Sequence, residues 1–296
     1  MWNLLKKEEY RFAYWLLFPT LIILLLIIAY PILDTFYLSL HKYYLTRPHV
    51  RPFIGLKNYL YFLQDDEFWA SIYRTLYFMV VSVGIELVFG ILTALLLTQK
   101  AKGMGLLKTI IILPWAVPTI VNGAIWKWIY NADYGALNGI LYKLGIISKY
   151  KAWLADPFTA LNFVIIADIW HTTPFVIIVM LAALSTIPDS LYEAAKIDGA
   201  GAIRRFFSVT LPLLTPAILV ALVIRTVEAF RVFDIIYVIT RGGPANGTQV
   251  IAYQAYLETF SYLHLGKGSA LSFIISIFIM ILAIIYIKVL YNKVEY

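Results

Sequence analysis

Four ionisable residues of alternating sign lie at intervals of three within an otherwise apolar stretch. They are Arg225, Glu228, Arg231 and Asp234. Residues three apart are neighbours on a helix, so adjacent members of the series can form ion pairs. Each step turns the position by about −60°, so the four spread over half the helix and cannot all face one partner. The pattern permits two functions: a self-neutralised structural seam, or a polar surface that binds a hydroxylated ligand through charge-assisted hydrogen bonds.

A second apolar stretch carries polar and aromatic residues beside a proline. Asp168, Trp170 and Thr172 precede Pro174, which removes one helical hydrogen bond and frees a backbone carbonyl near Trp170. An ionisable side chain in a membrane-length apolar stretch costs about 2.5–3.5 kcal/mol on insertion scales. These groups should therefore face a protein interior or a wet cavity, where Asp168 either contacts a ligand or neutralises Arg225.

The composition excludes an ordinary soluble domain. Of the 296 residues, 61% are hydrophobic and 14% are charged, whereas soluble domains carry about 25% charged residues. The net charge of +7 forms no basic stripe separable from the apolar runs, so we expect contact with lipid headgroups and not with nucleic acid. The absence of cysteine excludes disulfides and thiolate metal ligands, and the four histidines form no metal-binding constellation.

Six apolar segments are long enough to span a bilayer, which needs about 20 residues. They cover residues 12–33, 75–99, 109–126, a part of 157–188, 212–239 and 268–287. The first follows a basic flank as in a signal peptide, but it is too long and no small-residue cleavage site follows, so we expect a retained anchor. The expected fold class is an all-α membrane protein with six transmembrane helices.

A short polar island interrupts the apolar segments. Ser190 and Glu193 have the spacing of a capping box, which predicts a helix that starts at Ser190. Gly199 can end that helix at positive φ. A second short helix, Ala202–Ser208, leads to Pro212, a favourable first residue for the next helix. The island therefore predicts an exposed helix–turn–helix on one side of the membrane.

The island resembles a known family signature, the EAA loop of ABC importer membrane subunits. That signature reads Glu-Ala-Ala, three residues, Gly, nine residues and Ile-x-Leu-Pro. Here Glu193-Ala194-Ala195 is followed at the matching spacing by Gly199 and by Val209-x-Leu211-Pro212. Only Val209 departs from the pattern, and it keeps the apolar β-branched character.

Further stretches resemble the carbohydrate-importing members of this family. They are Gly55–Tyr59 with Phe68-Trp69, Tyr134–Asn138, Trp153–Pro157, Arg225–Asp234 and Thr240–Pro244. The resemblance covers nearly the whole chain, which is identified as a member of the maltose/trehalose-type branch. It implies the permease core of a type I ABC importer, formed by residues 1–296 as a single transmembrane domain.

The resemblance also implies residue roles. The island, at about residues 185–211, would be a cytoplasmic coupling loop that docks on an ATPase. The residues implied for this coupling are Glu193, Ala194, Ala195, Asp198, Gly199, Arg204 and Arg205. The helices on either side would supply the sugar contacts, for which our candidates are Asp168, Trp170, Thr172, Arg225 and Glu228.

The family's organisation sets the expected location and partners. Lysine and arginine are equally numerous in the loops on both sides, so the orientation comes from the resemblance, which places both termini in the cytoplasm of a multi-pass cell-membrane protein. The expected partners are a second permease in a heterodimer, two ATPase subunits that hold ATP and magnesium, and an extracytoplasmic sugar-binding protein. The chain itself is expected to hold no cofactor and to catalyse no reaction.

Import of a neutral di- or oligosaccharide is the function that the resemblance implies. Within the same class, a charged polyol such as glycerol phosphate remains open, because Arg225 and Arg231 can serve an anion. A proton-coupled secondary transporter is a second alternative, with Glu86, Asp168 or His171 as the proton carrier. An intramembrane enzyme would need a catalytic constellation, and we find none in the sequence.

Overall fold

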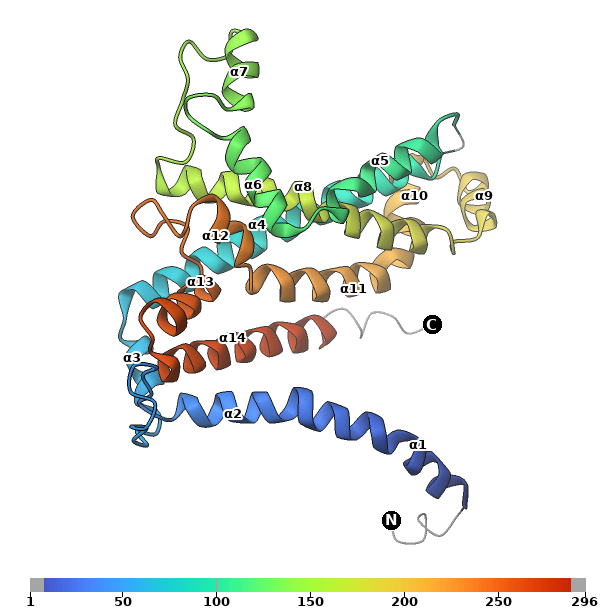
Figure 1. Ribbon diagram of the computed structural model, residues 1–296. Helices are drawn as coiled ribbons and strands as arrows, with labels where there is room; N and C mark the ends of the chain where they lie inside the picture. Colours follow the sequence, from blue (N-terminus) through green and yellow to red (C-terminus); the bar gives the residue numbers. More distant parts are fainter. Residues whose placement is uncertain (1–7, 100, 289–296) are drawn as a thin grey trace. The chain divides into compact units, whose positions relative to one another are not determined.

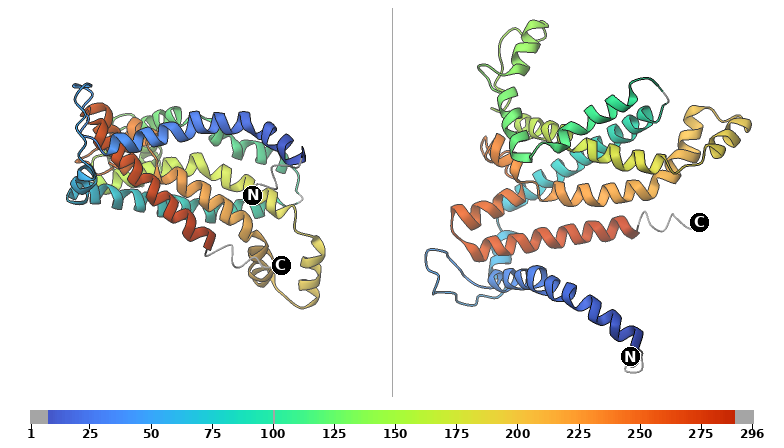
Figure 2. Two further views of the ribbon diagram at one scale, coloured as in Figure 1. Left: turned by 90° about the horizontal axis from the view of Figure 1, so that it is seen from below. Right: turned by 45° about the vertical axis from the view of Figure 1, so that its right-hand side comes forward.

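The computed structural model describes residues 8–99 and 101–288. Their regular structure is helical, apart from one isolated β-bridge between His41 and Phe53. The chain divides into two compact units, one formed by residues 1–65 and 255–274 and the other by residues 66–254 and 275–296. Figures 1 and 2 show the course of the helices within each unit.

The first unit contains a long apolar helical run. Helix α1 (Glu8–Leu24), a π-helical turn (Leu25–Ala29) and α2 (Tyr30–Ser39) continue one another. Residues 12–39 form a candidate membrane span in which no residue of the most apolar window is buried by protein. A helix of this length and composition is suited to a bilayer.

A compact cap follows this helical run in the same unit. It contains α3 (Lys57–Leu63), a π-helical turn (Leu257–Ser261) and the start of α14 (Leu265–Tyr286). Asn58 closes the cap, since its Nδ2 donates to the carbonyl oxygens of Ser39 at 2.7 Å and His41 at 3.0 Å.

Three long helices form the centre of the second unit: α4 (Asp66–Leu97), α8 (Pro157–Leu184) and α11 (Leu211–Phe230). Gly90 lets α4 approach α8 closely, because a Cβ at this position would lie only 2.5 Å from Val176 Cγ1. The apolar core that these helices share includes Leu97, Val176, Met180 and Leu214, all of them buried.

Local sequence determines where α8 begins. Asp156 is the N-cap, with Oδ1 2.9 Å from both the backbone nitrogen and the hydroxyl of Thr159. These hydrogen bonds lower the pKa of the Asp156 carboxyl. Pro157 occupies the first turn, where its missing N–H costs no hydrogen bond.

The third predicted span is broken. Helix α5 (Met104–Ala116) and α6 (Thr119–Ile129) are bent by 96° at the break between them. Val117 is extended, because Pro118 disfavours a helical conformation in the residue before it. The described chain therefore has five helices that are long and apolar enough to span a membrane, or six if the bent pair counts as one span.

The fifth predicted segment also contains a break. Helix α11 ends at Phe230, and α12 (Asp234–Ile239) begins after a three-residue connection. Helix α12 packs on α6, where Gly123 faces Val238 so closely that a Cβ would lie 3.0 Å from Val238 Cβ. Residues 202–239 form one candidate membrane span, as the apolar segment 212–239 predicted, but the helix is interrupted after Phe230, and the two broken segments pack against each other.

Three short helices lie outside the central helices of the second unit. They are α7 (Ala136–Lys143), α9 (Asp189–Ile197) and α10 (Ala202–Arg205). A fourth, α13 (Ile251–Tyr256), crosses the boundary between the two units at its end. Helices α9 and α10 lie beyond the ends of α8 and α11, away from α6 and α12 (Figures 1 and 2).

Candidate substrate-binding cavity and exposed segment

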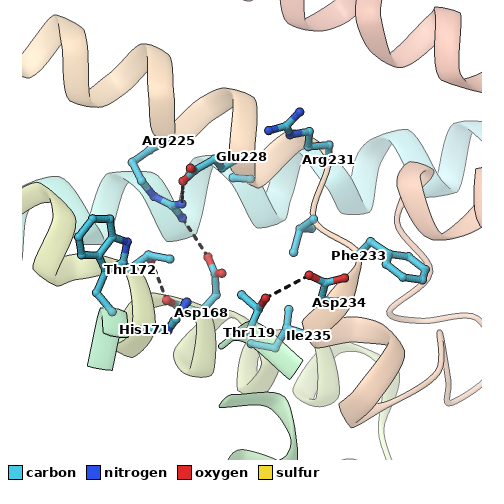
Figure 3. Close-up of a pocket in the computed structure, with 13 residues that line it drawn as sticks. Thr119, Asp168, His171, Thr172, Arg225, Glu228, Arg231, Phe233, Asp234 and Ile235 are labelled. Atoms are coloured by element: carbon cyan, nitrogen blue, oxygen red, sulfur yellow. Dashed lines mark hydrogen bonds and ion pairs between the residues drawn. The ribbon is translucent and has the colours of Figure 1, made fainter. Parts of the chain in front are cut away.

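One guanidinium group joins the three central helices. Arg225 of α11 contacts Glu86 of α4 through Nε–Oε2 at 2.6 Å and Nη2–Oε1 at 3.0 Å. Its Nη2 also lies 3.2 Å from Asp168 Oδ2 of α8, and its Nη1 lies 2.6 Å from Glu228 Oε2 (Figure 3). We call Glu86, Asp168, Arg225 and Glu228 the charge cluster.

The charge cluster is buried on one side and open on the other. The side chains of Glu86 and Arg225 are 0% and 3% exposed, whereas that of Glu228 is 51% exposed. The Thr172 hydroxyl lies 2.8 Å from Glu86 Oε1 and 2.7 Å from the Asp168 carbonyl oxygen, so it donates to one of them at a time. Glu228 is therefore the most exposed member of the cluster.

A polar cavity of about 280 Å³ adjoins the cluster within the second unit. Its lining comes from α5, α6, α8 and α11, from the break after α11, and from α12. The polar and aromatic lining residues are Trp115, Thr119, Asp168, His171, Thr172, Arg225, Glu228, Arg231, Phe233 and Asp234. Mixed aromatic, carboxyl and hydroxyl groups of this kind suit a hydroxylated solute.

The breaks in both segments bring helix starts to this cavity. Thr119 is the first residue of α6 and Asp234 the first of α12, and Thr119 Oγ1 donates to Asp234 Oδ2 at 3.1 Å (Figure 3). The four alternating charges therefore do not form one ladder on one helix. Arg225 and Glu228 pair on α11, while Arg231 caps the end of that helix and Asp234 contacts α6.

Trp170 does not meet the other candidate residues. It is two positions from both Asp168 and Thr172, and two positions turn a helix by about 200°. Trp170 lines a separate apolar cavity together with Pro174 and Trp126, whose ring centroid lies 5.8 Å away. The structure thus brings together Asp168, Thr172, Arg225 and Glu228 and leaves Trp170 on the other face of α8.

Several groups in or beside the cavity were absent from the sugar-contact candidates chosen by sequence. Trp115 and Phe233 supply aromatic surface to the polar cavity, and Glu86 is the main partner of Arg225. An isolated carboxyl at mid-span was the available signal for Glu86, because a buried charge needs a partner. His171 also lines the cavity, and its Nδ1 lies 2.9 Å from the Pro114 carbonyl oxygen at the end of α5.

The loop at residues 185–211, which we call the exposed segment, has the turn expected from its sequence. Gly199 has φ +77°, and Ala200 N donates to Ala195 O at 2.8 Å while Gly199 N donates to Lys196 O at 3.1 Å. These two bonds close α9 as a Schellman motif, which favours glycine at this position.

Two details of the exposed segment differ from the sequence prediction. The capping box is wrong: α9 begins at Asp189 after Pro188, and no side chain caps it. The second helix is also shorter than predicted. Helix α10 ends at Arg205, and a π-helical turn (Phe206–Thr210) leads directly into α11. Pro212 lies in the first turn of α11 as expected.

The predicted coupling residues lie on the surface of the protein. Glu193, Ala194, Asp198, Gly199 and Arg204 are exposed, and Ala195 and Arg205 are partly buried. Two apolar side chains beside them are also open to the surroundings: Ile197 is 85% exposed and Ile203 is 78% exposed. The segment therefore presents apolar surface that the described part of the chain does not cover.

The described residues also contain no group of three or more His, Cys, Asp or Glu side chains that could hold a metal ion. The predominantly helical fold, the membrane-length helices and the polar cavity together define an integral membrane protein with a polar site for a solute.

Comparison of the sequence with a family model identifies the protein family. Residues 86–295, well over half of the chain, match the binding-protein-dependent transport system inner membrane component family. The chain belongs to this family and is a multi-pass permease subunit of an ABC importer. Such a subunit works in a complex with a binding protein and an ATPase. Family membership decides against a proton-coupled secondary transporter.

Individual relatives match over almost the entire chain. The trehalose/maltose transport system permease MalF of Thermococcus litoralis is 44% identical over 288 residues, which is 96% of this chain and 95% of that protein. The sulfoquinovosyl glycerol permease SmoG of Agrobacterium fabrum is 38% identical, with 94% and 90% covered. The trehalose permease SugA of Mycobacterium tuberculosis is 37% identical, with 96% and 90% covered.

A solved structure supports the same fold. A chain of a bacterial ABC transporter for the acidic polysaccharide alginate superposes with a TM-score of 0.83 at 23% identity, covering 99% of both chains. This similarity confirms the all-helical permease fold.

Proposed function

We propose that this chain is the permease of an ATP-driven importer for a neutral di- or oligosaccharide, and that the sugar passes through the polar cavity. The proposal rests on the hydrogen bonds of Arg225, whose guanidinium donates to carboxyl oxygens at four places. Two relatives are named for trehalose transport, which fits a solute rich in hydroxyl groups. We also propose that residues 1–296 act together as one permease domain.

Arg225 is poorly placed to bind an anionic substrate, and the other cation in the cavity lining is the exposed Arg231. Arg225 makes four hydrogen bonds to carboxyl oxygens, one from Nε, one from Nη1 and two from Nη2. A guanidinium has five N–H groups, so at most one remains for a solute. Bidentate recognition of a phosphate or carboxylate needs two. Arg225 therefore orients Glu228, and Glu228, Asp168 and Thr172 face the sugar hydroxyls.

The partners follow from the exposed segment and from the family. We propose that residues 185–211 dock on one of two ATPase subunits, which hold ATP and magnesium, and that Ile197 and Ile203 are buried there. This docking places both termini in the cytoplasm. A second, different permease subunit would complete the pathway, and an extracytoplasmic binding protein would deliver the sugar.

Glu228→Gln tests the sugar site in the complete reconstituted complex. Because Glu228 is half exposed, losing its ion pair should lower stability by about 1 kcal/mol or less. Losing a charge-assisted hydrogen bond to sugar should weaken trehalose binding roughly tenfold. Asp133→Asn, an exposed acid outside the cavity, is the control and should change neither quantity. Reduced thermal stability with unchanged sugar affinity would assign Glu228 to the scaffold alone.

A further inference from the structure

One side-chain hydrogen bond joins the two halves of the exposed segment. The first half, α9, follows α8, and the second half, α10 with the π-helical turn, runs directly into α11. The Tyr192 hydroxyl on α9 lies 3.1 Å from the hydroxyl of Thr210, the last residue of that turn, and either group can donate. Among the described residues, no other side-chain hydrogen bond or ion pair connects α9 to the rest of the chain.

The main chain constrains the two halves less than this bond does. It passes through Gly199, at φ +77°, and through Gly201, and a Cβ at either position would meet no atom within 4 Å. No side chain caps the start of α9. Thr210, in contrast, is only 3% exposed and lies directly before the first residue of α11. The hydrogen bond therefore ties α9 to a buried position at the start of α11.

The helices that carry the two halves also form two walls of the polar cavity. Helix α8 supplies Asp168 and Thr172, and α11 supplies Arg225 and Glu228. The chain joins α9 to the first wall through residues 185–188 and joins α10 to the second wall through the π-helical turn. A bond between the two halves is therefore a bond between the two walls at their ends.

We infer that Tyr192 and Thr210 are positioning residues that make both walls of the cavity follow one movement of the ATPase. This inference rests on the proposed docking of residues 185–211. Neither residue lines the cavity, so both act through α8 and α11. Coupling between distant sites is carried by hydrogen bonds and packed side chains that link rigid elements. Without the bond, α9 and α10 can move separately, and ATP hydrolysis then changes the cavity without transferring sugar.

The test removes each hydroxyl with little change in shape. Tyr192→Phe keeps the ring, and Thr210→Val keeps the volume. In the complete complex with its binding protein in proteoliposomes, each variant should lower trehalose uptake per ATP hydrolysed about fivefold, the factor that one neutral hydrogen bond supplies. The double variant should lose no more than either single variant, because both changes remove the same bond. ATPase affinity should stay unchanged, because the exposed apolar side chains are kept.

Two further variants are the controls. Thr210→Ser keeps a hydroxyl and should preserve the wild-type ratio of uptake to hydrolysis. Tyr142→Phe on α7 removes a hydroxyl from an exposed tyrosine outside the exposed segment and should also preserve it. A wild-type ratio in both Tyr192→Phe and Thr210→Val, or additive losses in the double variant, would overturn the inference. Weaker ATPase affinity with an unchanged ratio would also overturn it, because the bond would then serve only the folding of the exposed segment.

Failure of the proposed function gives a different result. A wild-type complex that hydrolyses ATP without carrying trehalose would reject the proposed sugar. The bond is then tested without sugar, from the distance between nitroxide labels on Ala182→Cys of α8 and Leu213→Cys of α11, in a chain that has no other cysteine. With ATP bound, the distance distribution should be broader in Tyr192→Phe than in the wild-type background. Equal widths would overturn the inference.

Discussion

The charge cluster and the exposed segment place their polar and apolar groups in opposite ways. In the cluster, Arg225 is buried among carboxyl groups that satisfy it. In the exposed segment, the charged residues other than Arg205 are exposed, and the apolar Ile197 and Ile203 are exposed as well. The charge cluster has its ion-pair partners within the chain, whereas the exposed segment presents apolar surface that the described residues do not cover.

This difference indicates which property of the protein each region affects. A buried ion cluster contributes little net stability while all partners are present, but it is sensitive to the loss of a partner that is itself buried. An exposed apolar side chain costs little in the free chain and stabilises a complex when a partner covers it. Changes in the cluster should therefore affect the permease itself, whereas changes in the exposed segment should affect its coupling to other subunits.

Arg225→Leu should have the largest effect. It leaves Glu86 and Asp168 buried without a cation, which should destabilise the permease by about 3–5 kcal/mol. The measurement is the thermal unfolding of the purified complex, together with its yield from the membrane.

A double variant provides the control for this effect. Adding Glu86→Leu to Arg225→Leu removes the buried carboxylate, so part of the lost stability should return. Wild-type stability in the single variant would mean that the cluster is dispensable, and the contrast with the exposed segment would be lost.

Much of the exposed segment could be predicted from sequence, because its signals are local. Gly199 needs only its own backbone conformation, and Pro212 needs only the first turn of the next helix. The charge cluster could not be predicted in the same way. Glu86 and Arg225 are 139 residues apart, and their pairing depends on how α4 and α11 pack.

The membrane spans show the same division between local and tertiary signals. Apolar length located the segments, but residues 109–126 were predicted as one span, and the structure breaks it at Pro118, between α5 and α6. No proline lies at the break after Phe230, so no local signal in the sequence marked it, and the four alternating charges were treated as part of one helix. Trp170 was a sugar-site candidate because of the family resemblance, although the helical period places it opposite Asp168 and Thr172.

Gly199→Val should have an intermediate effect that is confined to coupling. A β-branched residue at φ +77° is strained by roughly 1–2 kcal/mol, and no neighbouring atom lies within 4 Å of the new Cβ, so the cost is in the backbone alone. The complex should assemble but lose sugar-stimulated ATP hydrolysis and uptake.

Gly201→Ala is the matched control for Gly199→Val. Gly201 also has open space around it, but its φ is −64°, which alanine adopts without strain. It should behave like wild type. Normal uptake by Gly199→Val would show that the turn geometry is not required for coupling.

Ile203→Ser should have the smallest effect on the permease and still weaken its complex. Ile203 is 78% exposed, so its replacement should change permease stability by no more than about 0.5 kcal/mol. Burial of this side chain against an ATPase would contribute about 1.5–3 kcal/mol, so its loss should weaken ATPase binding roughly tenfold or more. The assay measures re-binding of the ATPase to stripped permease and, separately, thermal unfolding of that permease. Ile140→Ser on α7 is the control, because Ile140 is 58% exposed and lies outside the exposed segment. Equal ATPase affinity in both variants would mean that Ile203 is covered by something else, and that α10 does not form the docking surface.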